Sequence, residues 1–165
     1  MIPPNLTDEA TSQGQSIEVR SESTGRVLAV DPGKARVGIA LSDELRVLAS
    51  PLTVLDGSDR LRVVANVLKL VREHEVKRVL VGLPLHMSGS AGAAAGRATD
   101  LAQRIADATG LEVELVDERL TTVEATRKSR EARGTKRRDK AETIDDKAAC
   151  VLLQSWLDRP RPREV

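Results

Sequence analysis

Short apolar runs alternate with polar segments and turn residues along the chain, and the length of each run indicates the element that it forms. Three early runs, Val27–Val30, Val37–Leu41 and Val47–Leu55, are short and bounded by turn residues, which is typical of strands. Asp31-Pro32-Gly33 separates the first two, and Asp56-Gly57 follows the third. This order predicts an antiparallel meander of three strands.

Beyond this meander the apolar spacing changes to that of a helix. Ser58 caps a predicted helix whose apolar residues recur at steps of three and four, namely Leu61, Val64, Leu68 and Val71. Strand and helix patterns then alternate, which is typical of parallel strands joined by helical crossovers. The segments are a strand over Val79–Leu83, a helix over Ala91–Thr109, a strand over Leu111–Val116, a helix from Thr121 to about Arg133 and a helix from Thr143 to Leu157.

These elements predict an α/β fold with a mixed five-stranded sheet flanked by helices. Three antiparallel strands come first, and parallel βαβ units follow. The chain of 165 residues suits one domain, which we place at residues 25–158. Residues 1–24 are polar and Pro-containing, and residues 159–165 alternate Arg with Pro, so both are predicted to be disordered tails.

Composition narrows the functional classes. Lys and Arg number 26 against 25 Asp and Glu, so the net charge of +1 indicates neither a nucleic acid nor a membrane as partner. No apolar run approaches the roughly 18 residues of a membrane span, and the N-terminus lacks a signal-peptide layout, which predicts a cytoplasmic protein with no membrane partner. Cys150 excludes an internal disulfide and fits a small core residue. With Trp156 as the one aromatic residue, any nucleic acid must be held by phosphate and shape.

Three acids stand at predicted element ends where they could converge: Asp31, Glu118 and Asp145. Carboxylates suit Mg²⁺ or Mn²⁺, and two such ions about 4 Å apart can promote phosphodiester hydrolysis. Two His and one Cys are too few for a zinc site. Taken singly, each acid has a simpler reading: Asp31 as a turn residue, Glu118 as a surface acid, and Asp145 or Asp146 as a charge at a helix N-terminus.

Four ordered blocks resemble one known family. They are Asp31-Pro32-Gly33 with Arg36-Val37-Gly38-Ile39-Ala40, Val81-Gly82-Leu83-Pro84-Leu85, Val116-Asp117-Glu118-Arg119-Leu120-Thr121-Thr122, and Asp145-Asp146-Lys147-Ala148-Ala149 with Leu152-Leu153-Gln154. These motifs are similar to those of the YqgF/RuvX family of pre-16S rRNA nucleases and Holliday junction resolvase homologues, which has a ribonuclease H-like fold. The resemblance covers about Arg26 to Leu157.

The resemblance implies a metal-dependent endonuclease with a two-metal-ion mechanism. Its catalytic and metal-binding acids would be Asp31, Glu118 and Asp145, with Asp31 bridging both ions. Asp146 fits a helix cap better than a ligand, and Asp117 keeps a smaller chance of assisting. The implied role is processing of the 5′ end of precursor 16S rRNA. The alternatives are a four-way-junction resolvase, which would be a symmetric homodimer, and a non-catalytic nucleic-acid-binding module, which would be expected to lose these acids.

Basic residues concentrate between the second and third of these acids. From Glu118 to Lys140 there are nine basic residues against four acidic ones, which favours a path for a phosphate backbone over a merely solvated helix face. The loop after Pro84 reads Leu-His-Met-Ser-Gly where the family usually has Asn, Met, Asp, Gly, and it leads into a helix N-terminus. The predicted nucleic-acid contacts are Lys34, Arg36, His86, Ser88, Arg119, Arg133, Lys136, Arg137 and Arg138.

Overall fold

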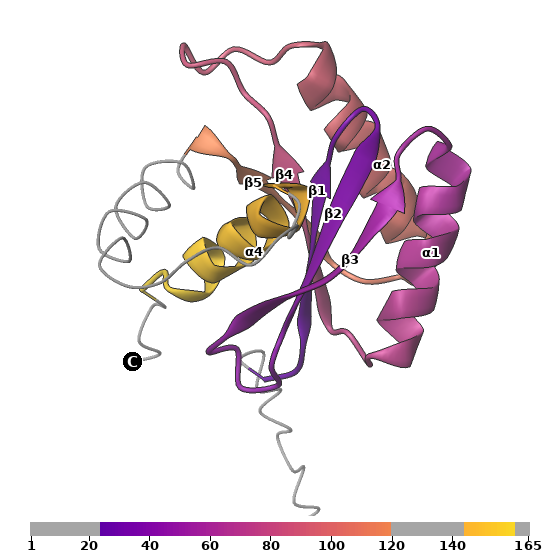
Figure 1. Ribbon diagram of the computed structural model, residues 1–165, viewed down its shortest axis with the longest axis vertical. Coiled ribbons are helices and arrows are strands. Elements are labelled where there is room, and N and C mark those ends of the chain that lie inside the picture. Colours follow the sequence, from indigo (N-terminus) through magenta and orange to yellow (C-terminus); the bar gives the residue numbers. More distant parts are fainter. Residues whose placement is uncertain (1–23, 120–143, 161–165) are drawn as a thin grey trace, which may run out of the picture.

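The computed structural model describes residues 24–119 and 144–160. Its centre is a five-stranded sheet in the order β3-β2-β1-β4-β5 (Figure 1). β1 pairs antiparallel with β2 and parallel with β4, so the predicted mixed sheet is confirmed. The strands are β1 (Val27–Pro32), β2 (Arg36–Ser42), β3 (Ala49–Asp56), β4 (Arg78–Leu83) and β5 (Val113–Asp117).

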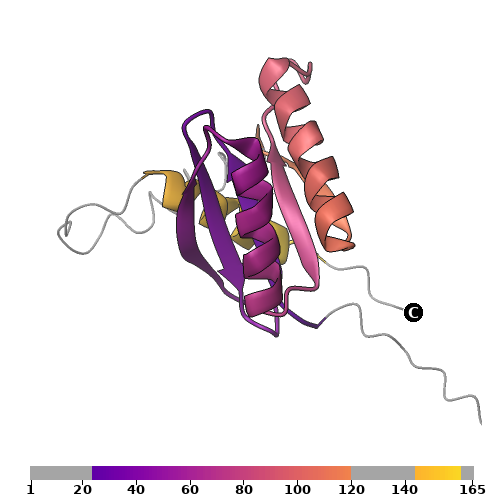
Figure 2. The same cartoon turned by 90° about the vertical axis from the view of Figure 1, so that its right-hand side faces the viewer.

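Helices cover both faces of this sheet. α1 (Arg60–Glu73) and α2 (Ala93–Thr109) lie side by side on one face (Figure 2), and α4 (Ile144–Leu157) lies on the other (Figure 1). The carboxyl ends of β1, β4 and β5 share one edge because these strands are parallel. Side chains at the ends of these three strands are therefore brought together.

Alternation along β1 divides the core into two layers. Leu28 and Val30 pack with residues of α1 and α2, whereas Val27 and Ala29 pack with residues of α4. All four are fully buried, as expected for a central strand covered on both faces. This alternation decides the face to which the next residue, Asp31, belongs.

Two predicted boundaries were wrong. Asp59, rather than Ser58, caps α1, because its carboxylate accepts the backbone N–H groups of Leu61 (3.0 Å) and Arg62 (3.2 Å). The third strand begins at Ala49 instead of Val47. The N–H groups of Val47 and Leu48 are bound by the Asp43 side chain, so they are unavailable to a neighbouring strand.

Several smaller differences complete the comparison. β1 continues one residue past Asp31, α2 begins at Ala93, and β5 runs from Val113 through Asp117. The predicted end of α2 is confirmed, because Gly110 caps it in the left-handed conformation. The predicted tails, apart from Thr24 and Arg159–Pro160, and the helix from Thr121 lie outside the described residues, as does the Thr143 cap.

Cys150 behaves as the small core residue that was predicted. It is half-buried beside the α4 core layer, and its thiol donates to the Ala49 carbonyl oxygen at 3.4 Å. Within residues 24–119 and 144–160, no helix has the length and apolar character to cross a bilayer.

Candidate active site

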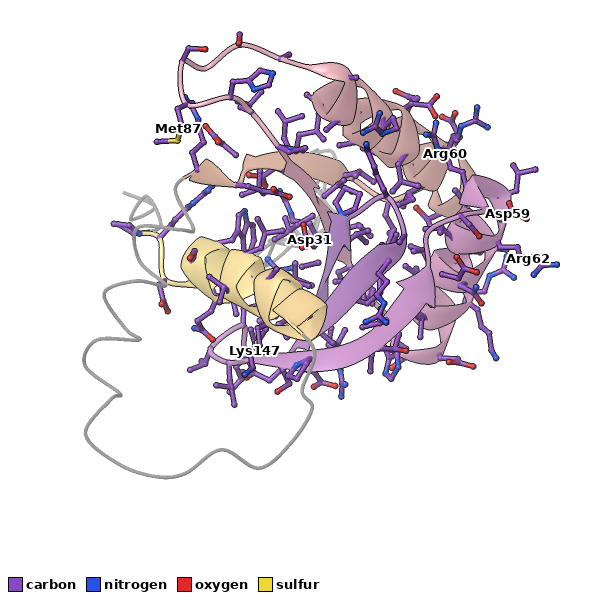
Figure 3. The ribbon with its side chains drawn as sticks, turned by 45° about the horizontal axis from the view of Figure 1, so that its top comes forward. Asp31, Asp59, Arg60, Arg62, Met87 and Lys147 are labelled. Carbon is purple, nitrogen blue, oxygen red and sulfur yellow. The ribbon has the colours of Figure 1, made fainter. Side chains whose placement is uncertain are left out.

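Asp31 projects from β1 toward the face of the sheet that α4 covers. It follows Val27 and Ala29 at two-residue steps, and both of those side chains belong to the α4 core layer. Asp31 is half-buried, and Figure 3 shows it in the middle of the molecule, away from the surface residues Asp59 and Arg62 of α1. The strand thus holds a carboxylate at the sheet edge where β1, β4 and β5 end.

Glu118 reaches the same place from β5. It comes two residues after Val116, which also packs in the α4 core layer. Its backbone N–H donates to the Leu83 carbonyl oxygen at 3.2 Å, which continues the β4–β5 pairing past the end of β5. Its carboxyl group lies close enough to that of Asp31 for the interaction between them to raise the pKa of Glu118. Two of the three predicted acids, one from each of two strands, are therefore in contact.

This pairing changes the protonation of the site. Burial raises the pKa of Glu118 to about 8, and the hydrogen bond to Asp31 and the negative charges of Asp31 and Asp117 add to the rise. Without a cation, two carboxylates this close do not both ionise readily. Glu118 therefore tends to keep its proton at neutral pH, and a divalent cation would take the place of that proton.

Glycines form the floor around the two carboxylates. Gly38 is directly opposite Asp31 in the β1–β2 register and so lies on the same face. Gly82 of β4 is buried, and a Cβ placed there would overlap Oε1 of Glu118. Bare backbone beside hard oxygen donors is a fitting place for a small divalent cation. The quoted motifs contain both glycines, but no role was predicted for them, although a glycine inside a strand signals a close approach of this kind.

The third predicted acid lies in the first turn of α4. Asp145 and Asp146 both fall within Ile144–Leu157, and their side chains lie outside those that the structure describes. Among the side chains it does describe, no group of three His, Cys, Asp or Glu residues gathers to hold a metal. The preference for Asp145 over Asp146 as a metal ligand stays a prediction. Both residues belong to α4, which lies on the face of the sheet toward which Asp31 projects.

Asp117 has a different partner from its neighbour in sequence. One of its oxygens accepts the backbone N–H of Arg119 (3.0 Å), and the other accepts from the Arg119 guanidinium (2.6 Å). These bonds lower the pKa of Asp117, so it remains a carboxylate. Asp117 therefore anchors Arg119, and the sequence-based prediction that it assists at the metal site receives no support from this contact.

With this geometry in place, comparisons with known proteins give the family. Residues 25–159 match the family described as "RuvX: Holliday junction resolvase", which is most of the chain. The chain belongs to the RuvX family. A relative from Anaeromyxobacter sp. (strain Fw109-5), named for pre-16S rRNA nuclease activity, is 45% identical over 81% of this chain and 96% of its own length. A Rhodococcus erythropolis relative with the same name is 40% identical over 94% of this chain and 90% of its own length.

Solved structures agree on the fold. RuvC of Thermus thermophilus in complex with a Holliday junction substrate has a TM-score of 0.55 at 18% identity, covering 81% of this chain and 93% of that one. At this identity the likeness shows the ribonuclease H-like fold alone. Membership of this family makes the RuvX protein a nuclease, a hydrolase of phosphodiester bonds.

Five of the predicted substrate-binding residues of this RuvX protein lie within the described part of the chain. Lys34 and Arg36 are exposed at the turn between β1 and β2. Arg119 is half-buried, with its guanidinium held by Asp117, and it lies close to Gly89 of the loop before α2. Arg133, Lys136, Arg137 and Arg138 lie outside the described residues. Their roles remain predictions.

His86 and Ser88 lie in a compact loop between β4 and α2. The His86 N–H donates to the Ser90 carbonyl oxygen (3.0 Å), and the Gly89 N–H donates to that of His86 (2.7 Å). The Ser88 and Ser90 hydroxyls are 3.0 Å apart. All these side chains are exposed, and Met87 projects from the same loop with 92% of its surface accessible (Figure 3). The loop therefore offers an exposed rim above the sheet edge.

Gly82→Ala tests whether the bare floor serves the site. The new methyl group would displace the far end of the flexible Glu118 side chain instead of backbone, so the fold should tolerate it while the carboxylate moves. A displacement of this size is expected to reduce kcat/KM for nucleic-acid cleavage by about 100-fold. Cleavage kinetics and thermal melting measure the two effects.

Gly96→Ala is the matched control for that substitution. Gly96 lies within α2, and a Cβ there would meet nothing within 4 Å. Its replacement should leave cleavage unchanged and stabilise the fold by roughly 0.5–1 kcal/mol, because alanine favours the helix. Full activity of Gly82→Ala would show that Glu118 needs no glycine beside it.

Proposed function

We propose that this chain is a metal-dependent endonuclease that processes the 5′ end of precursor 16S rRNA. The observation that carries the proposal is the contact between Asp31 and Glu118, two carboxyl groups held partly out of water over a glycine floor. Curated relatives that span nearly the same length are named for this activity. With such a substrate, the protein would act in the cytoplasm.

The donor set fits Mg²⁺ or Mn²⁺. Asp31 and Glu118 offer carboxylate oxygens, and Asp145 in the first turn of α4 would complete the set. A pair of such ions, once bound, would activate a water molecule and stabilise the leaving oxygen. Asp31, on the central strand between β2 and β4, would be the ligand shared between two ions.

The protein's own groups prepare the site for the cation. Glu118 must release the proton that it holds beside Asp31 before a cation can bind there. Arg119, fixed by Asp117, keeps a positive charge next to the exposed loop 84–92. The exposed Lys34 and Arg36 add charge at the β1–β2 turn. Together these cations would guide a phosphate backbone across the strand ends.

Resolution of four-way DNA junctions is the second candidate, because the description of the matched family names it. It requires two copies that cut two strands in concert, and so a symmetric homodimer. A non-catalytic binding module is disfavoured, because such a module would be expected to lose these acids, and Asp31 and Glu118 are present and close together.

A cleavage panel tests the proposal. Precursor rRNA with its 5′ extension, linear duplex DNA and a four-way junction are each incubated with the protein in Mg²⁺ or in Mn²⁺. We expect the precursor rRNA to be cut at the mature 5′ end, and cutting to stop when EDTA removes the metal. Cutting of the junction alone, with a dimer in sedimentation, would favour the resolvase, and binding without cleavage of any substrate would favour the binding module.

A further inference from the structure

A cavity of about 460 Å³ lies on the other face of the sheet from the two carboxylates. Its walls include Val37 of β2, Val63 of α1 and Leu101 of α2, so it lies between the sheet and the two helices that Figure 2 shows side by side. Pro32 lines it and directly follows Asp31 in β1. Because side chains alternate along a strand, the cavity and the acids are on opposite faces of the same strand end.

Three cations line this cavity. Lys34 follows β1, Arg60 begins α1, and Arg97 lies in the second turn of α2. The described residues that line it include no acid. Just outside, Asp100 binds both Arg60 and Arg104, and these bonds lower the pKa of Asp100. Asp100 thus fixes Arg60 in position.

We propose that this cavity binds a nucleoside monophosphate unit. The phosphate would lie among the three cations, and the sugar and base would lie against the accessible apolar residues of the lining, Pro32, Pro84 and Ala94. The volume is within the range of small-molecule sites, and walls that are mostly apolar with a few convergent polar groups are typical of them. An inorganic anion alone would leave the apolar wall unused.

This nucleotide unit can come from two sources. It is either a free mononucleotide or one nucleotide of a bound strand that crosses the end of β1 from the carboxylates. The second source rests on the proposed nuclease function, whereas the binding of a nucleotide as such does not.

Two substitutions at exposed positions test the cavity. Arg97→Glu reverses one of its charges, and Ala94→Trp fills its mouth from the first turn of α2. Arg72→Glu makes the same charge change at an exposed site of α1 outside the lining. The probes are adenosine and guanosine 5′-monophosphate and inorganic phosphate, titrated in EDTA by calorimetry and NMR. Melting curves check that each variant folds.

We expect both mononucleotides to bind more tightly than inorganic phosphate. Arg97→Glu and Ala94→Trp should each weaken nucleotide binding about tenfold, which corresponds to about 1.4 kcal/mol, and Arg72→Glu should leave it unchanged. Absence of saturable binding, equal affinities in all three variants, or phosphate binding as tightly as the nucleotides would overturn the proposal. Because these titrations involve no cleavage, they stand or fall independently of the nuclease assays.

A competition experiment shows whether the nucleotide unit in the cavity is a free ligand or part of the substrate. If the unit belongs to the substrate, mononucleotide should compete with nucleic acid, and Ala94→Trp should raise KM with kcat unchanged. If it is a free ligand, nucleotide and nucleic acid should bind at the same time. Both results support a nucleotide site, and they assign it to different occupants.

Discussion

Asp31→Asn should abolish cleavage, with a loss of at least about 1,000-fold in kcat, while nucleic-acid binding changes by less than about threefold. The amide keeps the size of the side chain but removes the charge that a shared metal ligand needs. The acid faces a floor of glycines and not the exposed rim where substrate contacts are predicted, so binding should survive. Single-turnover cleavage and fluorescence anisotropy measure the two quantities separately.

Asp107→Asn is the control for this change. Asp107 is exposed on α2, where it accepts a hydrogen bond from Gln103, and an asparagine oxygen can accept the same bond. Its substitution should leave both quantities unchanged. Undiminished turnover of Asp31→Asn would refute the assignment of this acid to the metal site. An equal loss of binding and cleavage would instead make Asp31 a substrate contact.

Glu118→Gln should remove activity and at the same time stabilise the metal-free protein. Folding raises the pKa of Glu118 from 4.5 to about 8, so the folded state holds the proton more tightly than the unfolded state does. Wild-type stability is therefore lost as the pH rises from 4.5 toward 8. Glutamine cannot ionise and escapes that loss. In EDTA above about pH 8 we expect a gain on the order of 2 kcal/mol, or about 5 °C in Tm.

Mg²⁺ should make the wild type more stable than Glu118→Gln, which reverses the order expected in EDTA. Mg²⁺ should raise the Tm of the wild type, because a cation that binds only the folded state stabilises it, and it should raise that of Glu118→Gln much less. Thermal melting at about pH 5.5 and pH 8.5, with EDTA or Mg²⁺, gives the four values needed for each protein. A stability difference that is the same at both pH values would show that ionisation of Glu118 costs the fold nothing.

Sequence patterns were sufficient for the mixed sheet. Asp31 lies near the end of β1 and Glu118 follows β5, and parallel strand ends meet at one edge, so the proximity of these two acids follows from local patterns and topology. The raised pKa of Glu118 does not follow, because it depends on how much water the surrounding elements exclude. The cavity beneath α1 and α2 was not predicted either, since Lys34, Arg60 and Arg97 come from three separate elements.

Contacts between distant segments mark where such patterns stop being informative. Arg46 is buried, and its guanidinium donates to the carbonyl oxygens of Gly25 (2.7 Å) and Thr24 (3.1 Å), more than twenty residues earlier. Nothing in the sequence on either side of Arg46 distinguishes it from a surface arginine. The Ser58 prediction failed for a similar reason: either Ser58 or Asp59 could cap a helix, and the backbone of the turn decides between them.

The outer strand β3 bears on how copies of the protein could associate. It forms one edge of the sheet, it contains Pro51, and its pairing with β2 is irregular between Ile39 and Ala40. Proline has no N–H to offer an incoming strand, and an irregular edge twists away from one. A continuous sheet through β3 of two molecules is therefore disfavoured. A two-fold assembly on this side of the molecule would have to join through helices or loops instead.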